Sequence, residues 1–180
     1  SGQGEVSEAE RALMLIGSLN DGMSLQNAFN QFYDGKGNPV NVTFTGTETL
    51  NDGGRNSLQE ALRKILDSYK DIEIIEAIPT SGELKYTISD DSEDNETKVF
   101  LLSNVGVSVK YKLGSAEVKE VKFTISLNIT IDMNESQVKN IVTYDLNGKI
   151  CSLEATLEGR KFTSASLNGQ SINVELLNSF

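Results

Sequence analysis

The sequence predicts an α+β protein in which a curved, mostly antiparallel β meander of about 8–10 strands carries two or three N-terminal helices on one face. Three observations support this fold class. Apolar residues recur with helical spacing in the first 70 residues. From residue 72 onward they alternate with polar residues, as in strands that bury one face. Two Asn-Gly pairs, at 147–148 and 168–169, are typical of two-residue hairpin turns.

Length and composition favour a single domain over residues 1–180, with a helical and mixed part at about 5–78 and the meander at about 72–178. The chain is 38% hydrophobic and 23% charged, so it can build one proper core. Its net charge of -10 disfavours nucleic acid and anionic lipid surfaces, which attract clustered Lys and Arg, and favours a soluble monomer. We expect no transmembrane segment, because no stretch approaches the roughly 20 apolar residues that span a bilayer.

Two short helices are expected before the first strand. Ser7 and Glu10 form a capping box, and the Asn20-Asp21-Gly22 sequence is expected to end the first helix. The apolar face of this helix is expected to contain Ala9, Ala12, Leu13, Ile16 and Leu19. A second helix is expected over 24–33, where Leu25, Ala28, Phe29 and Phe32 would be buried.

A strand over 40–46 and a polar loop over 47–56 lead into the strongest helix pattern. Ser57 and Glu60 form a second capping box, which predicts a helix over 57–70. Its apolar residues share one face of the helix, and the opposite face is charged. They are Leu58, Ala61, Leu62, Ile65, Leu66 and Tyr69.

The meander is expected to begin with strands at 72–79, 84–88, 98–103 and 105–113. The clearest strand covers 121–133, where every second residue is apolar from Val121 to Met133. At about 3.3 Å per residue it is roughly 40 Å long, so we expect it to curl or bulge. The two Asn-Gly turns and a weaker turn at 158–160 separate the remaining strands.

A sheet with one apolar face requires a cover, and short helices cover only part of it. The rest is closed by curling or folding of the sheet, by a fully packed core, or it remains as an apolar groove beneath a helical lid. Such a groove is a usual place for an apolar ligand. The sequence identifies no individual ligand-binding residue.

The acidic stretch after residue 88 supplies weak calcium candidates. Calcium binds several oxygen ligands, and five carboxylates lie close together in the sequence. They are Asp90, Asp91, Glu93, Asp94 and Glu96. The spacing lacks the central Gly and the distal Glu of an EF-hand loop. We therefore expect a mobile, solvated hairpin connection without a structural metal.

Four other features have a functional interpretation beside a structural one. The 51–57 segment with Arg55 is a candidate anion site or a flexible loop. The pairs Glu73 with Glu76 and Asp145 with Glu154 suit glycoside chemistry or simply lie on polar strand faces. Cys151, the single cysteine, is a reactive thiol or a small buried residue. The sequons at Asn41, Asn95, Asn128 and Asn134 are glycosylation acceptors or chance matches.

The chain contains no histidine and no recognisable catalytic motif, so we expect neither an enzyme nor a cofactor. The sequence favours a non-catalytic extracytoplasmic binding protein, a carrier of an apolar or lipid-like ligand in its specific form. The polar, Gly-rich 1–5 segment suits a tether left by a removed signal or lipid anchor, and equally a trimmed N-terminus. Two alternatives stay open: a surface module that acts through protein–protein contacts, and a carboxylate-dependent hydrolase.

Overall fold

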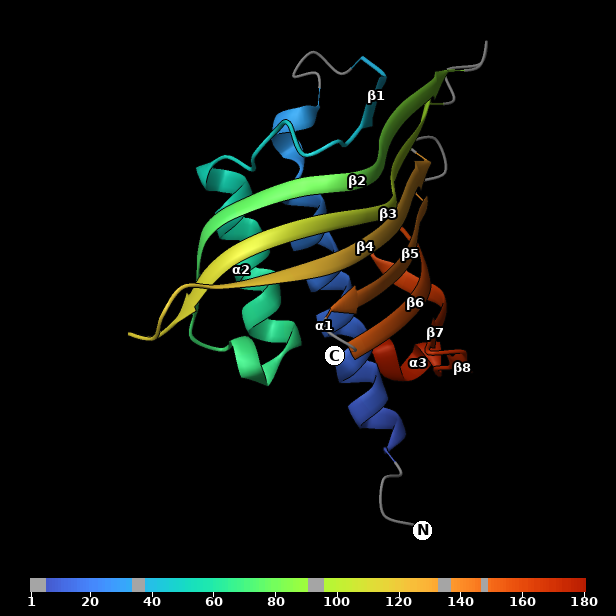
Figure 1. Ribbon diagram of the computed structural model, residues 1–180. Coiled ribbons are helices and arrows are strands. Elements are labelled where there is room, and N and C mark those ends of the chain that lie inside the picture. The colour runs from blue at the N-terminus through green and yellow to red at the C-terminus, as the bar shows by residue number, and fades with distance from the viewer. Residues whose placement is uncertain (1–5, 34–37, 91–95, 133–136, 147–148) are drawn as a thin grey trace.

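Eight strands of the described chain follow one another in sequence order across one antiparallel sheet that does not close on itself (Figure 1). The computed structural model describes residues 6–33, 38–90, 96–132, 137–146 and 149–180, with 139–146 and 149 described by their backbone pairing alone. The strands are β1 (Val40–Thr43), β2 (Ile72–Asp90), β3 (Glu96–Leu113), β4 (Lys119–Asp132), β5 (Gln137–Leu146), β6 (Lys149–Glu158), β7 (Lys161–Leu167) and β8 (Gln170–Ser171).

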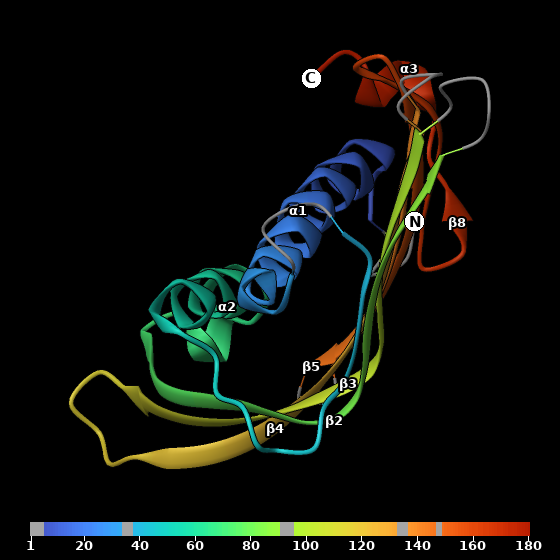
Figure 2. The same cartoon turned by 90° about the horizontal axis from the view of Figure 1, so that it is seen from above.

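The helices of the N-terminal part lie on the concave face of this sheet (Figure 2). The described helices are α1 (Glu8–Asn27), α2 (Asp52–Ile65) and α3 (Val174–Leu177), with 3-10 turns η1 (Asn30–Phe32) and η2 (Asp67–Tyr69). The predicted α+β fold with a curved antiparallel meander is therefore confirmed.

The first two long strands bend the sheet without breaking it. Separate strands had been expected at 72–79 and 84–88, and at 98–103 and 105–113. Instead, β2 and β3 are each continuous, and their pairing shifts at Ser81/Glu83 and at Leu102/Val105. Asn104 at the second shift has a positive φ of 47°. Each bulge interrupts the apolar alternation but preserves the hydrogen-bonded ladder on both sides. The interruption therefore suggested two separate strands where one continuous strand is present.

Strand β4 confirms the period-two prediction. Its inward residues Phe123, Ile125, Leu127 and Ile129 are buried, while Ile131 at the end is half-buried. Lys122 and Thr124 on the other face are exposed. The alternation thus identifies the concave, helix-covered side of the sheet.

Helix α1 is longer than expected, because the predicted stop at Asn20-Asp21-Gly22 is wrong. The helix continues to Asn27, and the expected second helix over 24–33 is its last turn followed by η1. Asp21 and Gly22 are both buried on the side that faces the core. A helix end at this place would bury free backbone N–H and C=O groups, so the continuous helix is favoured despite weak local propensity.

The side of α1 that packs inward also differs from the prediction. Ser7 does cap the helix, accepting a hydrogen bond from Glu10 N at 3.2 Å. However, Ala9 is exposed and Leu13 is 56% exposed. The buried face contains Ala12, Leu15, Ser18, Asp21, Gly22 and Leu25.

Helix α2 begins five residues before the predicted capping box at Ser57. Asn51 is the N-cap, and its side chain accepts a hydrogen bond from Gly54 N at 2.8 Å. A Cβ on Gly54 would lie 2.6 Å from the carbonyl oxygen of Ala28. The glycine therefore allows the start of α2 to approach the end of α1, whereas it had suggested a loop. The helix ends at Ile65, and Tyr69 is buried in η2.

The C-terminal hairpins follow the turn signals, but the meander ends before 178. Leu146 pairs with Lys149, Glu158 with Lys161, and Leu167 with Gln170. Strand β8 stops at Ser171 and is followed by the short α3. Asn178 just after α3 hydrogen-bonds Phe162 through both atoms of its side-chain amide, at 2.8 and 3.0 Å to the backbone N and O.

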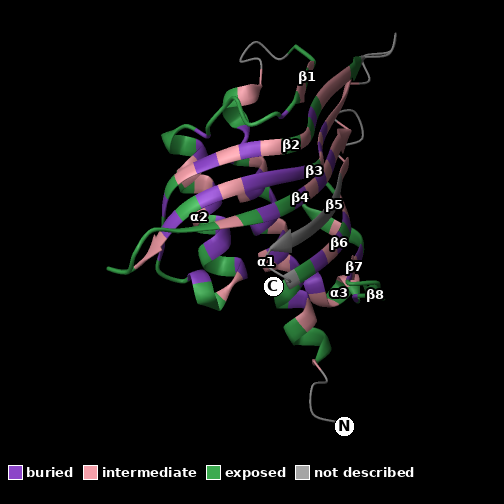
Figure 3. Ribbon diagram, viewed as in Figure 1, coloured by how far each residue is buried: buried purple, intermediate pink, exposed green. Residues whose placement is uncertain are grey.

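The core fills the space between the concave face and the two long helices, and Figure 3 shows buried positions along β2, β3, β4 and the helices.

Backbone and side-chain groups cover the outer edge of β2 over residues 72–82, which precede its pairing with β1. Arg63 donates to Ile72 O, and Gln59 accepts from Ile74 N. The 44–50 segment then donates to the carbonyls of Ala77, Pro79 and Gly82. This sheet edge is therefore not open for pairing with another chain.

Candidate functional site

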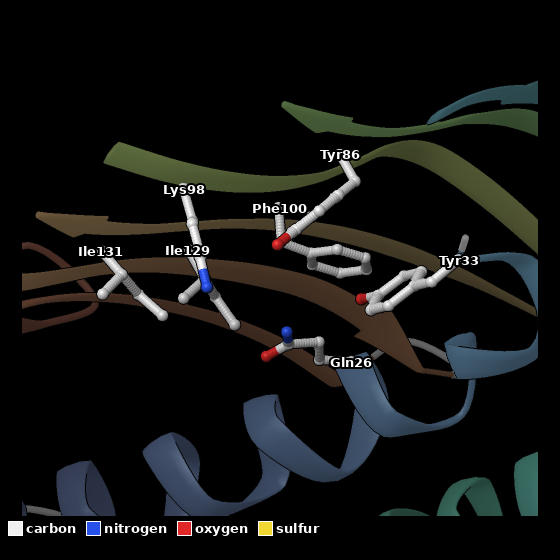
Figure 4. A pocket seen from close by; sticks show the side chains of 7 residues that line it. All are labelled: Gln26, Tyr33, Tyr86, Lys98, Phe100, Ile129 and Ile131. Carbon is white, nitrogen blue, oxygen red and sulfur yellow. The ribbon is translucent and has the colours of Figure 1, made fainter. Parts of the chain in front are cut away.

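An apolar cavity of about 200 Å³ lies between the C-terminal part of α1 and the sheet (Figure 4). On the sheet it is lined by the C-terminal parts of β2 and β4 and the N-terminal part of β3. We call it the Tyr33 cavity. Its lining is mostly aromatic and aliphatic, with a few polar groups. The lining residues are Gln26, Tyr33, Tyr86, Lys98, Phe100, Ile129 and Ile131.

Strand register brings the sheet residues of the cavity together. Tyr86 pairs with Phe100, which pairs with Ile129, so these three residues form one row across β2, β3 and β4. Lys98 and Ile131 form part of the next row. Because side chains two apart along a strand share a face, both rows point toward α1.

Tyr33 closes the cavity from the helical side. Its ring stacks on Tyr86 with centroids 5.5 Å apart and planes at 15°, and contacts Phe100 at 5.1 Å. The preceding 3-10 turn is held by Phe32, which packs edge-on against Phe44 at 5.1 Å. Aromatic pairs of this kind add about 0.5–1.5 kcal/mol each beyond their buried area. Tyr33 is thus anchored by the sheet although it follows a helix.

Polar groups of four residues converge inside this apolar lining. Figure 4 shows the hydroxyls of Tyr33 and Tyr86, the Gln26 amide and the Lys98 ammonium directed toward the same space. Lys98 Nζ lies 3.3 Å from a carboxylate oxygen of Glu96 at the outer side. The Tyr33 hydroxyl is buried and has no hydrogen-bond partner at ordinary distance among the described residues. A buried donor left in this way is costly unless water or a ligand satisfies it.

The Tyr33 phenol stays protonated over the physiological range. Burial raises its pKa well above the usual value, the nearby Gln26 side chain lowers it in part, and Tyr86 raises it slightly. A protonated phenol donates a hydrogen bond, so it suits an acceptor oxygen on a ligand.

A second cavity, of about 490 Å³, lies farther along α1 toward its N-terminus, beside the start of β7. We call it the Phe162 cavity. It is wider and combines apolar side chains with two cations at its edge. The lining residues are Ile16, Leu19, Asn20, Arg160, Lys161, Phe162, Leu177, Asn178 and Phe180.

The volume of the Tyr33 cavity suits a small or slender apolar group. A dry cavity of about 150 Å³ is large enough for benzene. The Tyr33 cavity at about 200 Å³ therefore holds a ring or a short alkyl segment, with hydrogen-bond donors at hand. None of the residues that line it is a carboxylate, a histidine or a nucleophilic thiol.

Most of the calcium candidates lie outside the part of the chain that the structure describes. Asp91, Glu93 and Asp94 lie outside the described residues, as does the predicted mobile connection, and of Asp90 only the backbone is described. Glu96 pairs with Lys98. Among the residues that the structure describes, no group of three or more potential ligand side chains is placed to hold a metal ion.

The predicted anion loop at 51–57 is the first part of α2. Asn51 caps the helix, and the Arg55 guanidinium pairs with Asp52 and donates to Leu50 O at 3.1 Å. The Arg55 guanidinium, which was expected to help bind an anion, thus interacts with groups at the start of its own helix. The interpretation as a flexible loop is wrong, because residues 52–57 are helical, whereas anion binding stays untested.

The remaining candidates are dispersed over the sheet. Glu73 and Glu154 are exposed, Glu76 pairs with Lys110 at 3.4 Å, and the side chain of Asp145 lies outside the described set. Cys151 is buried, with its Sγ 3.5 Å from Ser18 Oγ, beside a cavity of about 190 Å³ between α1 and α2. This burial matches the structural interpretation of Cys151.

Two of the four sequons fall in the described chain. Asn41 is exposed on β1, while the side chain of Asn128 accepts a hydrogen bond from Thr130 at 3.2 Å. Asn95 and Asn134 lie outside the described residues. Whether any sequon carries a glycan stays a prediction to be tested.

None of the residues that line the Tyr33 cavity was singled out from the sequence. Ile129 and Ile131 belong to the alternating apolar series of 121–133, so their inward direction was readable, whereas Phe100 lies in the continuous apolar run 99–102. Tyr33 stood at the end of an expected helix, where nothing indicated that its ring would return to the sheet. Lys98 lies on the concave face in register with Ile131, but this position became evident only from the strand pairing.

No protein-family model, curated protein or solved structure matches the chain. Within the described residues, no helix combines the length and the apolar character needed to cross a bilayer. The class defined by the fold is an α+β protein with helices on the concave face of an open, curved antiparallel sheet. The interpretation of its cavities rests on their own geometry.

Proposed function

We propose that this protein is a non-catalytic, extracytoplasmic binding protein that holds an apolar or lipid-like ligand between its curved sheet and α1. The observation that carries the proposal is the Tyr33 cavity: an aromatic and aliphatic lining with a buried, unsatisfied phenol directed into it. Ligand sites typically combine a mostly apolar lining with a few convergent polar groups.

The chemistry of the lining selects for an amphipathic ligand. Phe100, Ile129 and Ile131 offer apolar contact, while Tyr33, Gln26 and Lys98 offer hydrogen-bond donors. A ligand that places an acceptor oxygen beside Tyr33 removes the cost of the unsatisfied hydroxyl and buries its hydrocarbon at the same time. A purely hydrophilic ligand gains only the first of these contributions.

The two other classes of function have less support in the described structure. A surface module that pairs through sheet edges needs an open edge, and the edge of β2 is covered from Ile72 to Gly82, which leaves β1 and the β7–β8 end of the described sheet for such pairing. A carboxylate-dependent hydrolase needs two acidic groups in one cleft. The residues that line the Tyr33 and Phe162 cavities include no Asp or Glu.

Fluorescence titration with the neutral apolar probe N-phenyl-1-naphthylamine tests the proposal. We expect saturable binding that octanoate displaces, and loss of binding in Ile131→Glu, which puts a charge into the cavity. Thr130→Glu is the matched control, since it adds the same charge on the opposite face of the same strand. Circular dichroism verifies that both variants fold. Absence of saturable binding, or equal binding by the two variants, refutes the proposal.

A further inference from the structure

The Tyr33 and Phe162 cavities lie at the two ends of one row of apolar side chains on the concave face. Lys98 pairs with Ile131, Ile131 with Val138, Val138 with Leu157, and Leu157 with Phe162. The first two residues of this row line the Tyr33 cavity, and the last lines the Phe162 cavity.

This row is apolar but only partly buried. Ile131, Val138, Leu157 and Phe162 are all half-buried. In the neighbouring row Phe100, Ile129 and Ala155 are buried. Among the residues whose side chains are described, the row of Phe100, Ile129 and Ala155 is therefore covered, whereas the row from Ile131 to Phe162 is only partly covered.

One flank of α1 runs along the same path. Ile16 and Leu19 line the Phe162 cavity, and Gln26 lines the Tyr33 cavity. Met23 lies between them on the same helical stripe, since the four positions are spaced three, four and three residues apart. Its side chain is 58% exposed although it is apolar. The stripe is thus a partly exposed wall, with Met23 exposed and Ile16, Leu19 and Gln26 half-buried.

The lengths of the wall and the floor agree. From Lys98 on β3 to Phe162 on β7 there are four strand spacings, which is about 19 Å. From Ile16 to Gln26 there are ten helical steps, or about 15 Å. Both lengths suit a single extended hydrocarbon chain.

We propose that the two cavities are the ends of one groove along α1 that binds a single-chain amphiphile, with its acceptor head group at Tyr33 and Lys98 and its chain over Val138 and Leu157 toward Phe162. This inference rests on the proposed function and adds the class, orientation and length of the ligand. The unsatisfied Tyr33 hydroxyl is the donor that places an acceptor-rich head at the smaller cavity, and the Lys98 ammonium, which also pairs with Glu96, is a second donor beside it. The row of sheet residues from Ile131 to Phe162 and the stripe on α1 set the path of the ligand's hydrocarbon chain.

Chain length is the decisive variable. Saturated fatty acids from octanoate to myristate are titrated below their aggregation limits by isothermal calorimetry. In the wild-type protein, each added methylene buries further apolar surface and strengthens binding by about fourfold until the groove is filled. Sodium decyl phosphate and decanoate serve as the two head-group arms, and the tighter one identifies the head group that the Tyr33 end prefers.

Variants halfway along the groove separate this inference from the proposed function. Met23→Glu is expected to leave octanoate affinity unchanged and to remove the gain between octanoate and myristate. Met14→Glu is the control, because Met14 is 51% exposed and lies nine residues before Met23, about half a turn away around α1. Leu157→Gln repeats the test from the sheet, with Thr156→Gln on the opposite face as its control.

The outcomes are distinguishable. If octanoate binds and Ile131→Glu abolishes that binding, but affinity does not depend on chain length, the proposed function stands and the single groove is refuted. If Arg160→Ala/Lys161→Ala weakens fatty-acid binding tenfold while Tyr33→Phe and Lys98→Ala leave it unchanged, the orientation is refuted. Lys70→Ala/Lys119→Ala controls for the loss of two positive charges. If no chain length binds, the proposed function itself fails.

Discussion

Replacing Gly82 by alanine tests the physical account of the sheet's curvature. Gly82 lies in β2 within the pairing shift between Ser81 and Glu83 and has a φ of 85°. A Cβ at this position would come 2.4 Å from the carbonyl oxygen of Asn104 and 2.6 Å from that of Ser103. Both contacts are with the backbone of the neighbouring strand, which cannot turn away as a flexible side chain does.

The expected magnitude has two parts. A non-glycine residue at positive φ costs about 1–2 kcal/mol. Separation of β2 from β3 at the bend weakens flanking hydrogen bonds worth about 0.5–1.5 kcal/mol each. With two such hydrogen bonds lost, we expect Gly82→Ala to lower the free energy of unfolding by about 2–5 kcal/mol, a large fraction of the about 5–15 kcal/mol that holds a domain together.

Gly46→Ala is the matched control for this prediction. Gly46 has nearly the same φ, 87°, but an added Cβ meets nothing within 4 Å. Its loss should be only the conformational part, about 1–2 kcal/mol. Urea unfolding followed by far-UV circular dichroism measures both values. Equal losses in the two variants would refute the claim that close approach of two backbones at this bend requires glycine.

Four further predictions concern three side chains. Tyr33→Phe removes an unsatisfied hydroxyl, so unfolding stability in the absence of ligand should stay equal or rise by about 1 kcal/mol, and a clear loss in urea unfolding would contradict the assignment. Because burial raises the pKa of Tyr33 in the fold, the phenol ionises more readily in the unfolded chain, and its contribution to stability is lost as pH rises above the unfolded pKa of about 10. The decline in wild-type stability above pH 10 should therefore be steeper than that of Tyr33→Phe, as measured by urea titration at each pH. Asn178→Ala removes both hydrogen bonds to the Phe162 backbone and should lower the free energy of unfolding by about 1–2 kcal/mol in the same assay; a change below about 0.3 kcal/mol would show that the amide contact is dispensable. Cys151 should react with a thiol reagent only as fast as the protein opens, so its modification should accelerate sharply across the urea transition, whereas rapid reaction of the native protein would show that the thiol is accessible.

Local sequence was sufficient where local structure has a short period. In β4 the alternation from Val121 identified the buried face, because neighbouring side chains of any strand point to opposite sides. The Asn168-Gly169 turn was equally readable: both residues have positive φ, at 50° and 79°, which Asn and Gly adopt more easily than other residues. The apolar face of α2 from Leu58 to Ile65 followed from its helical spacing in the same way.

The errors arose where packing outweighed local preference. Gly22 suggested a helix end and Gly54 a loop, yet one lies buried within α1 and the other in the first turn of α2. At Gly54 the reason is visible, since Ala28 O occupies the place of a Cβ. A glycine that permits close packing and a glycine that permits a turn are identical in the sequence, and only the neighbour distinguishes them.

The sequence by itself determined the class of fold, the apolar face of the central strands and the positions of the hairpin turns, because each of these depends on residues close together in the chain. The tertiary structure alone decided where the cavities lie. The Tyr33 cavity needs the end of α1 to meet three strands whose residues are 53 or more positions away, and the bulges near Gly82 and Asn104 must first curve the sheet toward the helix. Contacts at such separations depend on the bulges and on the curvature that they produce, and the local apolar pattern did not indicate either of them.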